Sequence, residues 1–223
     1  MENKLINYAI ILASGSGSRF ESDIPKQFVK IGDRTILEIT AQKFEIVQSV
    51  DRIIIVVNSE YLQKATELLR GYKKIYKIIP GGKTRKDSSY NAVSSIDDSE
   101  ANILIHDGVR PFVTPEIIND CINALNNGTK ALTTAIPSTD TIIEVKDDKI
   151  ISIPKRETLQ RVQTPQGFKL SLIRKAHELS KYDYDFTDDC GLVLRHKLAD
   201  ISIIKGSNDN IKITYPNDIN IDN

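Results

Sequence analysis

The chain has 223 residues, of which 40% are hydrophobic and 27% charged, a balance typical of one globular domain. Thirty basic and thirty acidic residues cancel, so no overall field favours nucleic acid or an anionic membrane, and any anion site has to be local. No apolar run approaches the roughly 20 residues that span a bilayer. The first residues lead directly into a strand pattern, so we expect no signal peptide and a cytoplasmic protein. Cys121 and Cys190 have no metal-type or redox spacing, and we expect them to be reduced, buried thiols.

Short runs rich in Ile and Val alternate along the chain with longer segments of helical periodicity. The apolar runs are almost continuous, as in parallel strands covered on both faces. This alternation predicts an α/β fold with a mostly parallel sheet and helices on both faces. The expected strands cover 8–13, 52–57, 75–79, 102–106 and 131–136, and the expected helices cover 36–44, 60–70, 85–96 and 115–125.

The first expected strand ends in a loop of small residues, 14–18, followed by Arg19 and Lys26. Glycine lets the backbone approach a ligand closely, and consecutive N–H groups in such a turn form an anion-binding concavity. Two cations just beyond the loop suit a triphosphate. The alternative is an ordinary strand-to-helix turn, because the loop matches neither the P-loop nor the full dinucleotide pattern.

Two more expected strands end in polar residues. Gly81-Gly82 opens a helix that carries Arg85 and Ser88, and His106-Asp107 is followed by Arg110. A carboxylate such as Asp107 can hold Mg²⁺ against phosphate oxygens, and Arg110 can clamp a phosphate; their alternative is an intrachain salt bridge. A lone His at a strand end is more often a hydrogen-bonded structural residue than a ligand. Because ligands bind beyond the carboxyl ends of parallel strands, we expect these ends to form one site.

The alternation changes after residue 136. Two β-type runs, 141–145 and 149–153, predict a hairpin that projects as an arm, over about 138–157, from a single domain covering residues 1–223. Exposed strand edges pair readily with another copy, so we expect a homodimer.

The rest of the chain is expected to form helices over 170–180 and 188–196 and strands over 200–204 and 210–214. Thr187-Asp188-Asp189 can cap the second of these helices, since carboxylates are favoured at a helix N-terminus. Alternation in the last strand sends Lys212 to the face opposite Ile211 and Ile213. Lys212 is either a point charge for a phosphate or a solvated residue of an edge strand.

Taken together and in this order, the motifs resemble the 2-C-methyl-D-erythritol 4-phosphate cytidylyltransferase family over nearly the whole chain, from Ala9 to Asp218. The matching motifs are the Ser/Gly loop with Arg19, Pro25-Lys26-Gln27, Gly81-Gly82 with Arg85 and Ser88, His106 to Phe112, Asp140-Thr141, Gln163-Thr164-Pro165-Gln166, Thr187-Asp188-Asp189 and Asn210 to Thr214.

The resemblance implies a Rossmann-like sheet, a dimer joined through the arm, Mg²⁺, and a nucleotidyl transfer in which CTP and a polyol phosphate give a CDP-polyol and pyrophosphate. It implies that catalysis falls to Arg19, Lys26 and Lys212. It places CTP against Ala13, Ser14, Gly15, Gly17, Gly82, Arg85 and Ser88. It places the acceptor against Asp107, Arg110, Thr141, Arg156, Thr164 and Lys212, with Asp107 also assisting the metal and with Thr141 and Arg156 reaching the neighbouring subunit.

The identity of the acceptor phosphate is the main alternative left open. We expect 2-C-methyl-D-erythritol 4-phosphate, for the synthesis of isoprenoid precursors, and Thr187-Asp188-Asp189 resembles that branch. Val109 is more common in the ribitol-phosphate enzymes, which serve cell-surface polymers, so ribitol 5-phosphate is the alternative. Ser14 stands where the family usually has Ala or Gly, and it adds a hydroxyl near the expected phosphates. A third possibility is a non-catalytic nucleotide-binding protein, since a fold does not determine a function.

Overall fold

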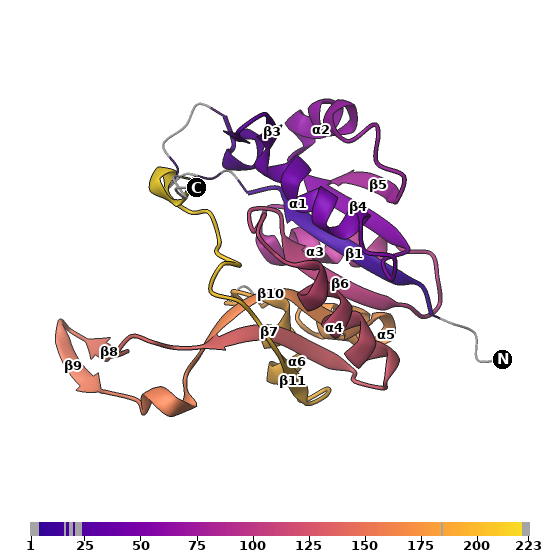
Figure 1. The fold of residues 1–223 in the computed structure, drawn as a ribbon. Helices are drawn as coiled ribbons and strands as arrows, with labels where there is room; N and C mark the ends of the chain where they lie inside the picture. The colour runs from indigo at the N-terminus through magenta and orange to yellow at the C-terminus, as the bar shows by residue number, and fades with distance from the viewer. Residues whose placement is uncertain (1–4, 16, 18–19, 21–23, 184, 220–223) are drawn as a thin grey trace.

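The structure, a computed structural model, describes residues 5–15, 17, 20, 24–183 and 185–219. Its centre is a seven-stranded sheet in the order β11-β7-β10-β6-β1-β4-β5 (Figure 1). Every neighbouring pair is parallel except the two that β10 makes with β6 and β7. The predicted mostly parallel α/β sheet is therefore confirmed. Its strands are β1 (Asn7–Ala13), β4 (Arg52–Val57), β5 (Ile75–Pro80), β6 (Asn102–Asp107), β7 (Ala131–Pro137), β10 (Gln160–Lys169) and β11 (Ile201–Lys205).

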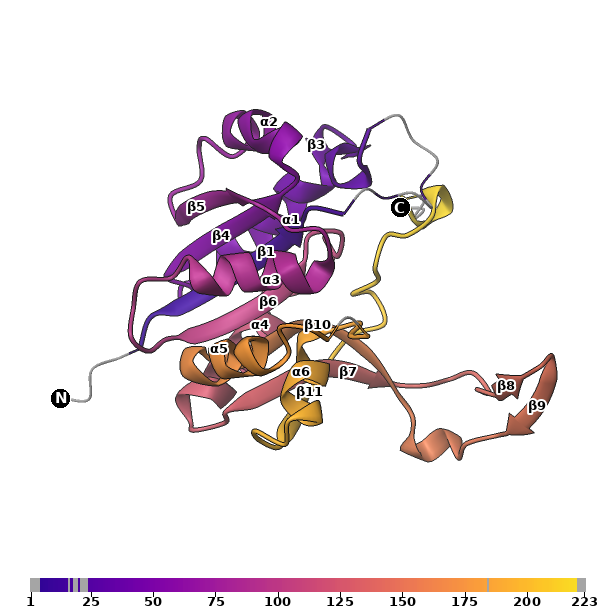
Figure 2. The same cartoon turned by 180° about the vertical axis from the view of Figure 1, so that it is seen from behind.

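Helices cover both faces of this sheet, as Figures 1 and 2 show from opposite sides. Side chains of β1 alternate between two cores: Ile11 packs with the helices α1, α2 and α4, and Ile10 with α3, α5 and α6. This arrangement explains why the strand sequences are apolar throughout. The α-helices are α1 (Ile36–Glu45), α2 (Leu62–Leu68), α3 (Arg85–Ser94), α4 (Pro115–Asn126), α5 (Leu170–Leu179) and α6 (Asp189–Arg195), and the 3₁₀ turns are η2 (Lys26–Phe28), η3 (Ser59–Tyr61), η4 (Arg156–Thr158) and η5 (Pro216–Ile219).

Side chains that accept hydrogen bonds from backbone N–H groups begin several helices. Thr84 accepts from the N–H of Asp87 in a capping box that begins α3, and Thr114 caps α4 ahead of Pro115. Among the described residues, no helix combines the length and apolar character needed to cross a membrane.

Strand β10 is the main element that the sequence did not predict. Its Pro165 has no N–H to donate, and the pairing register with β7 shifts between Gln163 and Gln166. The polar sequence around this bulge hid a strand whose residues 163–168 are buried in the middle of the sheet.

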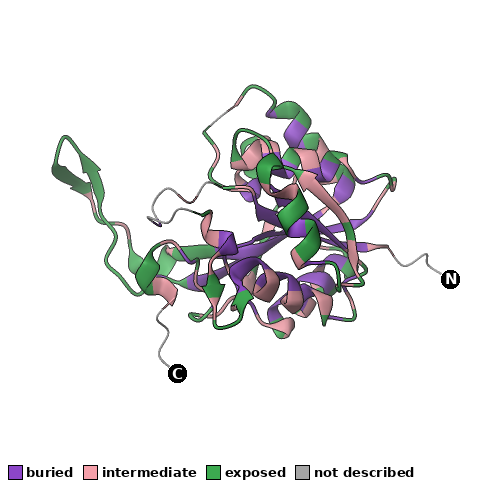
Figure 3. Ribbon diagram, turned by 90° about the horizontal axis from the view of Figure 1, so that it is seen from above, coloured by how far each residue is buried: buried purple, intermediate pink, exposed green. Residues whose placement is uncertain are grey.

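The arm leaves the sheet after β7 and returns through β10 (Figure 1). It contains a short antiparallel hairpin, β8 (Glu144–Lys146) with β9 (Lys149–Ser152), within the range predicted for the arm. A second pair, β2 (Lys30–Ile31) with β3 (Arg34–Thr35), precedes α1. Figure 3 shows the arm almost wholly exposed. Its exposed apolar side chains are Ile142, Ile143, Val145, Ile150, Ile151 and Ile153.

Candidate active site

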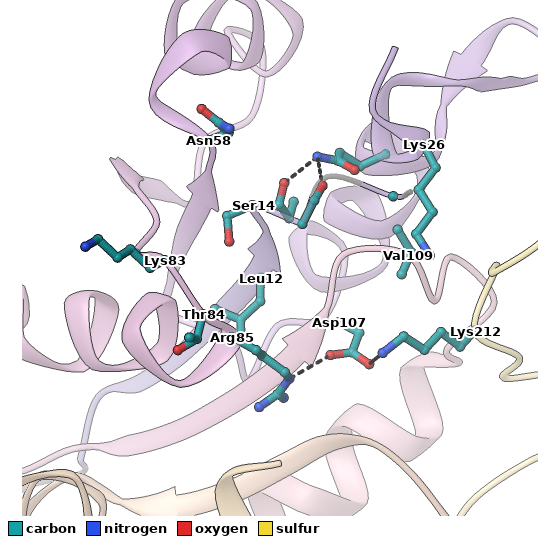
Figure 4. A pocket seen from close by; sticks show the side chains of 15 residues that line it. Leu12, Ser14, Lys26, Asn58, Lys83, Thr84, Arg85, Asp107, Val109 and Lys212 are labelled. Carbon is teal, nitrogen blue, oxygen red and sulfur yellow. Dashed lines mark hydrogen bonds and ion pairs between the residues drawn. The ribbon is translucent and has the colours of Figure 1, made fainter. Parts of the chain in front are cut away.

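The principal cavity lies at the carboxyl ends of β1 and β6, beside the loop that follows β5 (Figure 4). The three strand ends singled out in the sequence do meet here, as the parallel order of the sheet requires. The cavity has a volume of about 610 Å³. It is lined by Leu12, Ala13, Ser14, Gly15, Gly17, Lys26, Gln27, Asn58, Gly82, Lys83, Thr84, Arg85, Asp107, Val109 and Lys212.

The loop after β1 forms one wall of this cavity. The buried side chain of Gln27 donates from Nε2 to the carbonyl oxygens of Ala13, at 2.7 Å, and Gly15, at 3.2 Å. Gly17 has a φ of +70°, and a Cβ there would lie 3.1 Å from the Lys26 side chain. Glycine is therefore required for both conformation and space. The predicted catalytic residue Arg19 lies outside the described residues.

Lys26 follows on η2 and also lines the cavity. Its ammonium donates to the carbonyl oxygen of Ile213 at 2.7 Å. This contact ties the start of the chain to the segment after β11, which carries Lys212. Two cations far apart in sequence are thereby held on one side of the cavity (Figure 4).

Ser14 and the Gly81-Gly82 turn are connected through Ser88. The Ser88 hydroxyl accepts from the N–H of Gly82 at 3.1 Å, donates to the carbonyl of Thr84 at 2.9 Å, and lies 2.8 Å from the Ser14 hydroxyl. Ser88 is buried and lies behind the cavity wall, whereas Ser14 and Gly82 line it. Gly81 permits this close approach, since a Cβ there would lie 2.4 Å from that of Ser14.

Asp107, at the end of β6, is surrounded by cations. Lys212 Nζ lies 3.0 Å from its carboxylate, Arg85 Nε 3.4 Å and Arg110 Nε 3.5 Å. Burial by itself would raise the pKa of Asp107, but Arg85, Lys212 and Arg110 outweigh it and hold this pKa well below its usual value. The salt bridge between Asp107 and Arg110, the alternative given by the sequence, is therefore present. The three cations that surround Asp107 also line the smaller cavity described below.

His106 serves the structure of this turn. It is fully buried, and its Nε2 lies 3.1 Å from the Arg110 carbonyl, which can only accept, so Nε2 carries the proton. Its Nδ1 lies 3.0 Å from the Thr164 hydroxyl, which itself accepts from the N–H of Asp107 at 3.1 Å. Burial lowers the pKa of His106 to about 4, so the ring is neutral. The structural interpretation of this His is confirmed.

A smaller cavity of about 190 Å³ adjoins the first. Arg85, Asp107 and Lys212 line both cavities, so these three side chains stand at their common border. The predicted acceptor residues Arg110 and Thr164 line the smaller one. Its remaining lining residues are Val162, Gln163, Gln166, Thr187 and Asp188.

The strand predicted over 210–214 does not form. The chain leaves the sheet edge after β11, and its backbone bonds go elsewhere: the N–H of Ile213 donates to the Val109 carbonyl at 2.9 Å, and Arg110 donates to the Asn210 carbonyl at 2.8 Å. Ile213 is fully buried, while Lys212 reaches Asp107. Lys212 is therefore not a residue of an edge strand.

Thr141 and Arg156 lie together on the exposed arm, where Arg156 donates to the Thr141 hydroxyl at 3.1 Å. Neither lines the two cavities formed by the described residues of this chain. Their assignment to the neighbouring subunit's acceptor site therefore stays a prediction.

Sequence reasoning did not include Gln166 and Asp189 among the site residues. Gln166 lies at the β10 bulge, donates to Asp188 at 2.7 Å and accepts from the N–H of Asp189 at 3.1 Å. Asp188 caps α6, as the sequence suggested, but the neighbouring Asp189 is buried against Arg85. Both residues stand in motifs that match the family, Gln163-Thr164-Pro165-Gln166 and Thr187-Asp188-Asp189, but no role followed for either, and a helix cap explained the acidic pair equally well.

A metal ion would have one carboxylate, Asp107, at the border of the cavities. No group of three or more His, Cys, Asp or Glu side chains that could hold a metal occurs among the described residues. Mg²⁺ is commonly bound by one or two carboxylates together with substrate phosphates. One carboxylate would suit a Mg²⁺ that arrives with a nucleotide, but Asp107 is already paired with Lys212, Arg85 and Arg110, and the metal stays a prediction.

Comparison with known proteins adds independent information. The family model described as 2-C-methyl-D-erythritol 4-phosphate cytidylyltransferase matches residues 7–223. A protein of that name from Thermosipho melanesiensis is 42% identical over 96% of this chain and 95% of its own length, and one from Thermobifida fusca is 38% identical over 95% and 89%. A Haemophilus influenzae protein, the bifunctional ribulose 5-phosphate reductase/CDP-ribitol pyrophosphorylase, is 40% identical over 97% of this chain, which spans 47% of that protein.

Solved structures agree with these relatives. The 4-diphosphocytidyl-2C-methyl-D-erythritol synthase of Anaerococcus prevotii matches with a TM-score of 0.85 and 32% identity, over 96% of this chain and 95% of the other. The 2-C-methyl-D-erythritol 4-phosphate cytidylyltransferase of Francisella tularensis matches with a TM-score of 0.82 and 28% identity, over 96% of each chain. The predicted fold is therefore confirmed at the level of the whole chain.

Proposed function

Because the chain belongs to the 2-C-methyl-D-erythritol 4-phosphate cytidylyltransferase family, we propose that it transfers a cytidylyl group from CTP to 2-C-methyl-D-erythritol 4-phosphate and releases pyrophosphate. This family consists of nucleotidyltransferases, so the chain is an enzyme and not a non-catalytic binding protein. The observation that carries the proposal is the pair of adjoining cavities with Arg85, Asp107 and Lys212 at their border. The larger cavity suits the nucleotide and the smaller one the acceptor.

The reaction needs two anions brought together in line. A phosphate oxygen of the acceptor attacks the α-phosphorus of CTP, the bond from that phosphorus to the β-phosphate oxygen breaks, and pyrophosphate leaves with the electron pair. The acceptor phosphate is already nucleophilic at neutral pH, so the site requires no strong base. Holding two bound reactants in line can contribute roughly 7–11 kcal/mol.

The cationic side chains have distinct parts in this proposal. Lys26, held at the Ile213 carbonyl, faces the nucleotide cavity, where it stabilises charge that develops on the phosphates. Lys212 and Arg85 stand where the two reactants meet, and Arg110 lines the acceptor cavity. Asp107 would hold a Mg²⁺ that arrives with CTP, and that ion would supply further neutralisation of phosphate charge. The N–H groups of the loop after β1 suit the triphosphate.

We also propose that residues 1–223 act as one domain within a cytoplasmic homodimer. Six apolar side chains of the arm are at least 43% exposed, and burying them against a second copy would remove an apolar surface from water. That contact would bring Thr141 and Arg156 to the partner's acceptor cavity. Cys121 and Cys190 are free, buried thiols, as expected, which suits a reducing compartment.

Ribitol 5-phosphate is the second candidate acceptor. It is favoured by the 40% identity to the Haemophilus influenzae CDP-ribitol pyrophosphorylase. Val109, the residue that suggested this acceptor in the sequence, lines the larger cavity and not the smaller one that is proposed for the acceptor. Release of pyrophosphate by purified protein with CTP and Mg²⁺ tests both, with the two acceptors compared at equal concentration. A higher kcat/KM with 2-C-methyl-D-erythritol 4-phosphate supports the first candidate. A higher value with ribitol 5-phosphate assigns the second, and no turnover with either would refute both.

A further inference from the structure

A buried carboxylate lies behind the active-site wall. Asp189 is the first residue of α6, and its side chain is 1% exposed. One carboxylate oxygen accepts from the Ser89 hydroxyl at 2.5 Å, and the other accepts from Arg85 Nη1 at 2.6 Å. His177 Nε2 lies 3.8 Å from the first oxygen and 3.2 Å from the Ser89 hydroxyl.

These contacts connect three elements. Arg85 and Ser89 are four residues apart on α3, so they present one face to Asp189. The N–H of Asp189 donates to Gln166 on β10, which also binds Asp188, and this fixes where α6 begins. Asp189 is therefore fixed by both its backbone and its side chain, and it can in turn fix the position of Arg85.

Arg85 is the member of this group that reaches the site. Its Nε lies 3.4 Å from Asp107, and the residue lines both cavities. The guanidinium is thus held between two carboxylates, one at the end of β6 and one at the start of α6. A planar fork that is bound at two of its nitrogens has a defined orientation. No side-chain contact among the described residues engages its third nitrogen, Nη2.

A buried ion pair by itself is weak evidence for stability, because apolar side chains of similar volume often serve as well. A pair that ends on a side chain shared by two cavities suggests a different reason for its presence. We propose that Asp189 is a positioning residue: through Arg85 it orients the guanidinium toward the phosphates at the border of the cavities, with Ser89 holding the carboxylate in place. This inference rests on the proposed cytidylyl transfer.

A double-mutant cycle tests it. Asp189→Asn keeps the shape of the side chain and removes the charge that holds Arg85, and misplacement of about 1 Å can cost about a hundredfold in rate. We expect kcat with CTP and the acceptor to fall by on the order of ten- to a hundredfold. In an Arg85→Gln background the same substitution should cost less than about twofold, because the residue through which it acts is already gone. Ser89→Ala should repeat the pattern more weakly.

Asp98→Asn is the matched control. Asp98 is also paired with an arginine, Arg52 at 3.4 Å, and accepts a hydrogen bond from the hydroxyl of Tyr8. Tyr8 is the second residue of β1, at the end of the strand opposite to the site. The control substitution should leave kcat unchanged while altering thermal stability. Losses that multiply in the Asp189 and Arg85 double variant, or an Asp189→Asn enzyme with lowered melting temperature and wild-type kcat, would overturn the inference.

A second mutant cycle and a binding measurement test the same inference independently. If Asp189→Asn does not fold, the cycle of Ser89→Ala with Arg85→Gln answers the same question. CTP binding by calorimetry with the same variants gives a readout that does not depend on the acceptor, and non-additive losses of affinity are expected there too. Absence of turnover in the wild type would refute the proposed function, whereas additive losses in CTP affinity would refute the positioning role of Asp189.

Discussion

The neutral state of His106 predicts a specific acid sensitivity of the fold. Burial lowers its pKa from 6.5 to about 4. Above pH 6.5 the ring is neutral in both the folded and the unfolded chain. Between pH 6.5 and pH 4 the unfolded chain binds a proton that the folded chain does not, so stability is lost as the pH falls through this window.

The magnitude follows from the two pKa values. Between pH 7.5 and pH 5.0 the linkage relation gives a loss of about 2 kcal/mol for this one group. The structural reason is that a proton on Nδ1 would face the Thr164 hydroxyl, which now donates to that nitrogen and accepts from the N–H of Asp107. Protonation would therefore loosen the turn that presents Asp107 and Arg110.

The test compares the wild type with His106→Gln, whose amide can still donate to the Arg110 carbonyl. Free energies of unfolding are measured by urea denaturation at pH 7.5 and pH 5.0. We expect the variant to be less stable at pH 7.5 but to lose about 2 kcal/mol less than the wild type on acidification, since the other titrating groups are common to both. Equal losses in the two proteins would show that His106 is not the group responsible.

Three further substitutions test other parts of the site. Lys26→Ala should lower kcat for pyrophosphate release by on the order of a hundredfold. The control Lys30→Ala, which changes an exposed lysine nearby, should leave kcat unchanged. Equal rates in the wild type and both variants would show that Lys26 has no part in catalysis. Arg156→Ala should raise the KM for the acceptor roughly tenfold with little effect on the KM for CTP, as expected for loss of a charge-assisted contact, and sedimentation of the wild type as a monomer would contradict the role given to the arm. Gly81→Ala should weaken CTP binding, because the new Cβ would lie 2.4 Å from that of Ser14; adding Ser14→Gly should restore part of the affinity, and calorimetry that shows no restoration would locate the conflict elsewhere.

Local signals in the sequence were sufficient for most of the framework. The runs that became β1, β4, β6 and β7 were predicted within one residue at each end, because strands covered on both faces are apolar throughout. The acidic residues of 187–189 marked the start of α6. The carboxyl-end rule for parallel sheets placed Ser14, Gly82 and Asp107 around one cavity.

Contacts between distant residues decided the rest. Strand β10 has a polar sequence interrupted by Pro165, and it is a central strand because β6 and β7 pair with it on either side. The segment with Lys212 is not a strand, since its hydrogen bonds go to Val109, Arg110 and Lys26. A propensity rule cannot predict such pairings, because they depend on which side chains the sheet brings together.

The two aspartates at the start of α6 show most clearly which features the sequence determines and which depend on tertiary packing. By itself the sequence determined that a helix begins there and that carboxylates suit its N-terminus. Only the tertiary structure decided that Asp188 caps the helix while Asp189 turns inward to Arg85. The physical reason is that a helix turns by about 100° per residue, so adjacent side chains face different surroundings, and what those surroundings contain is set by the packing of α3 and β10.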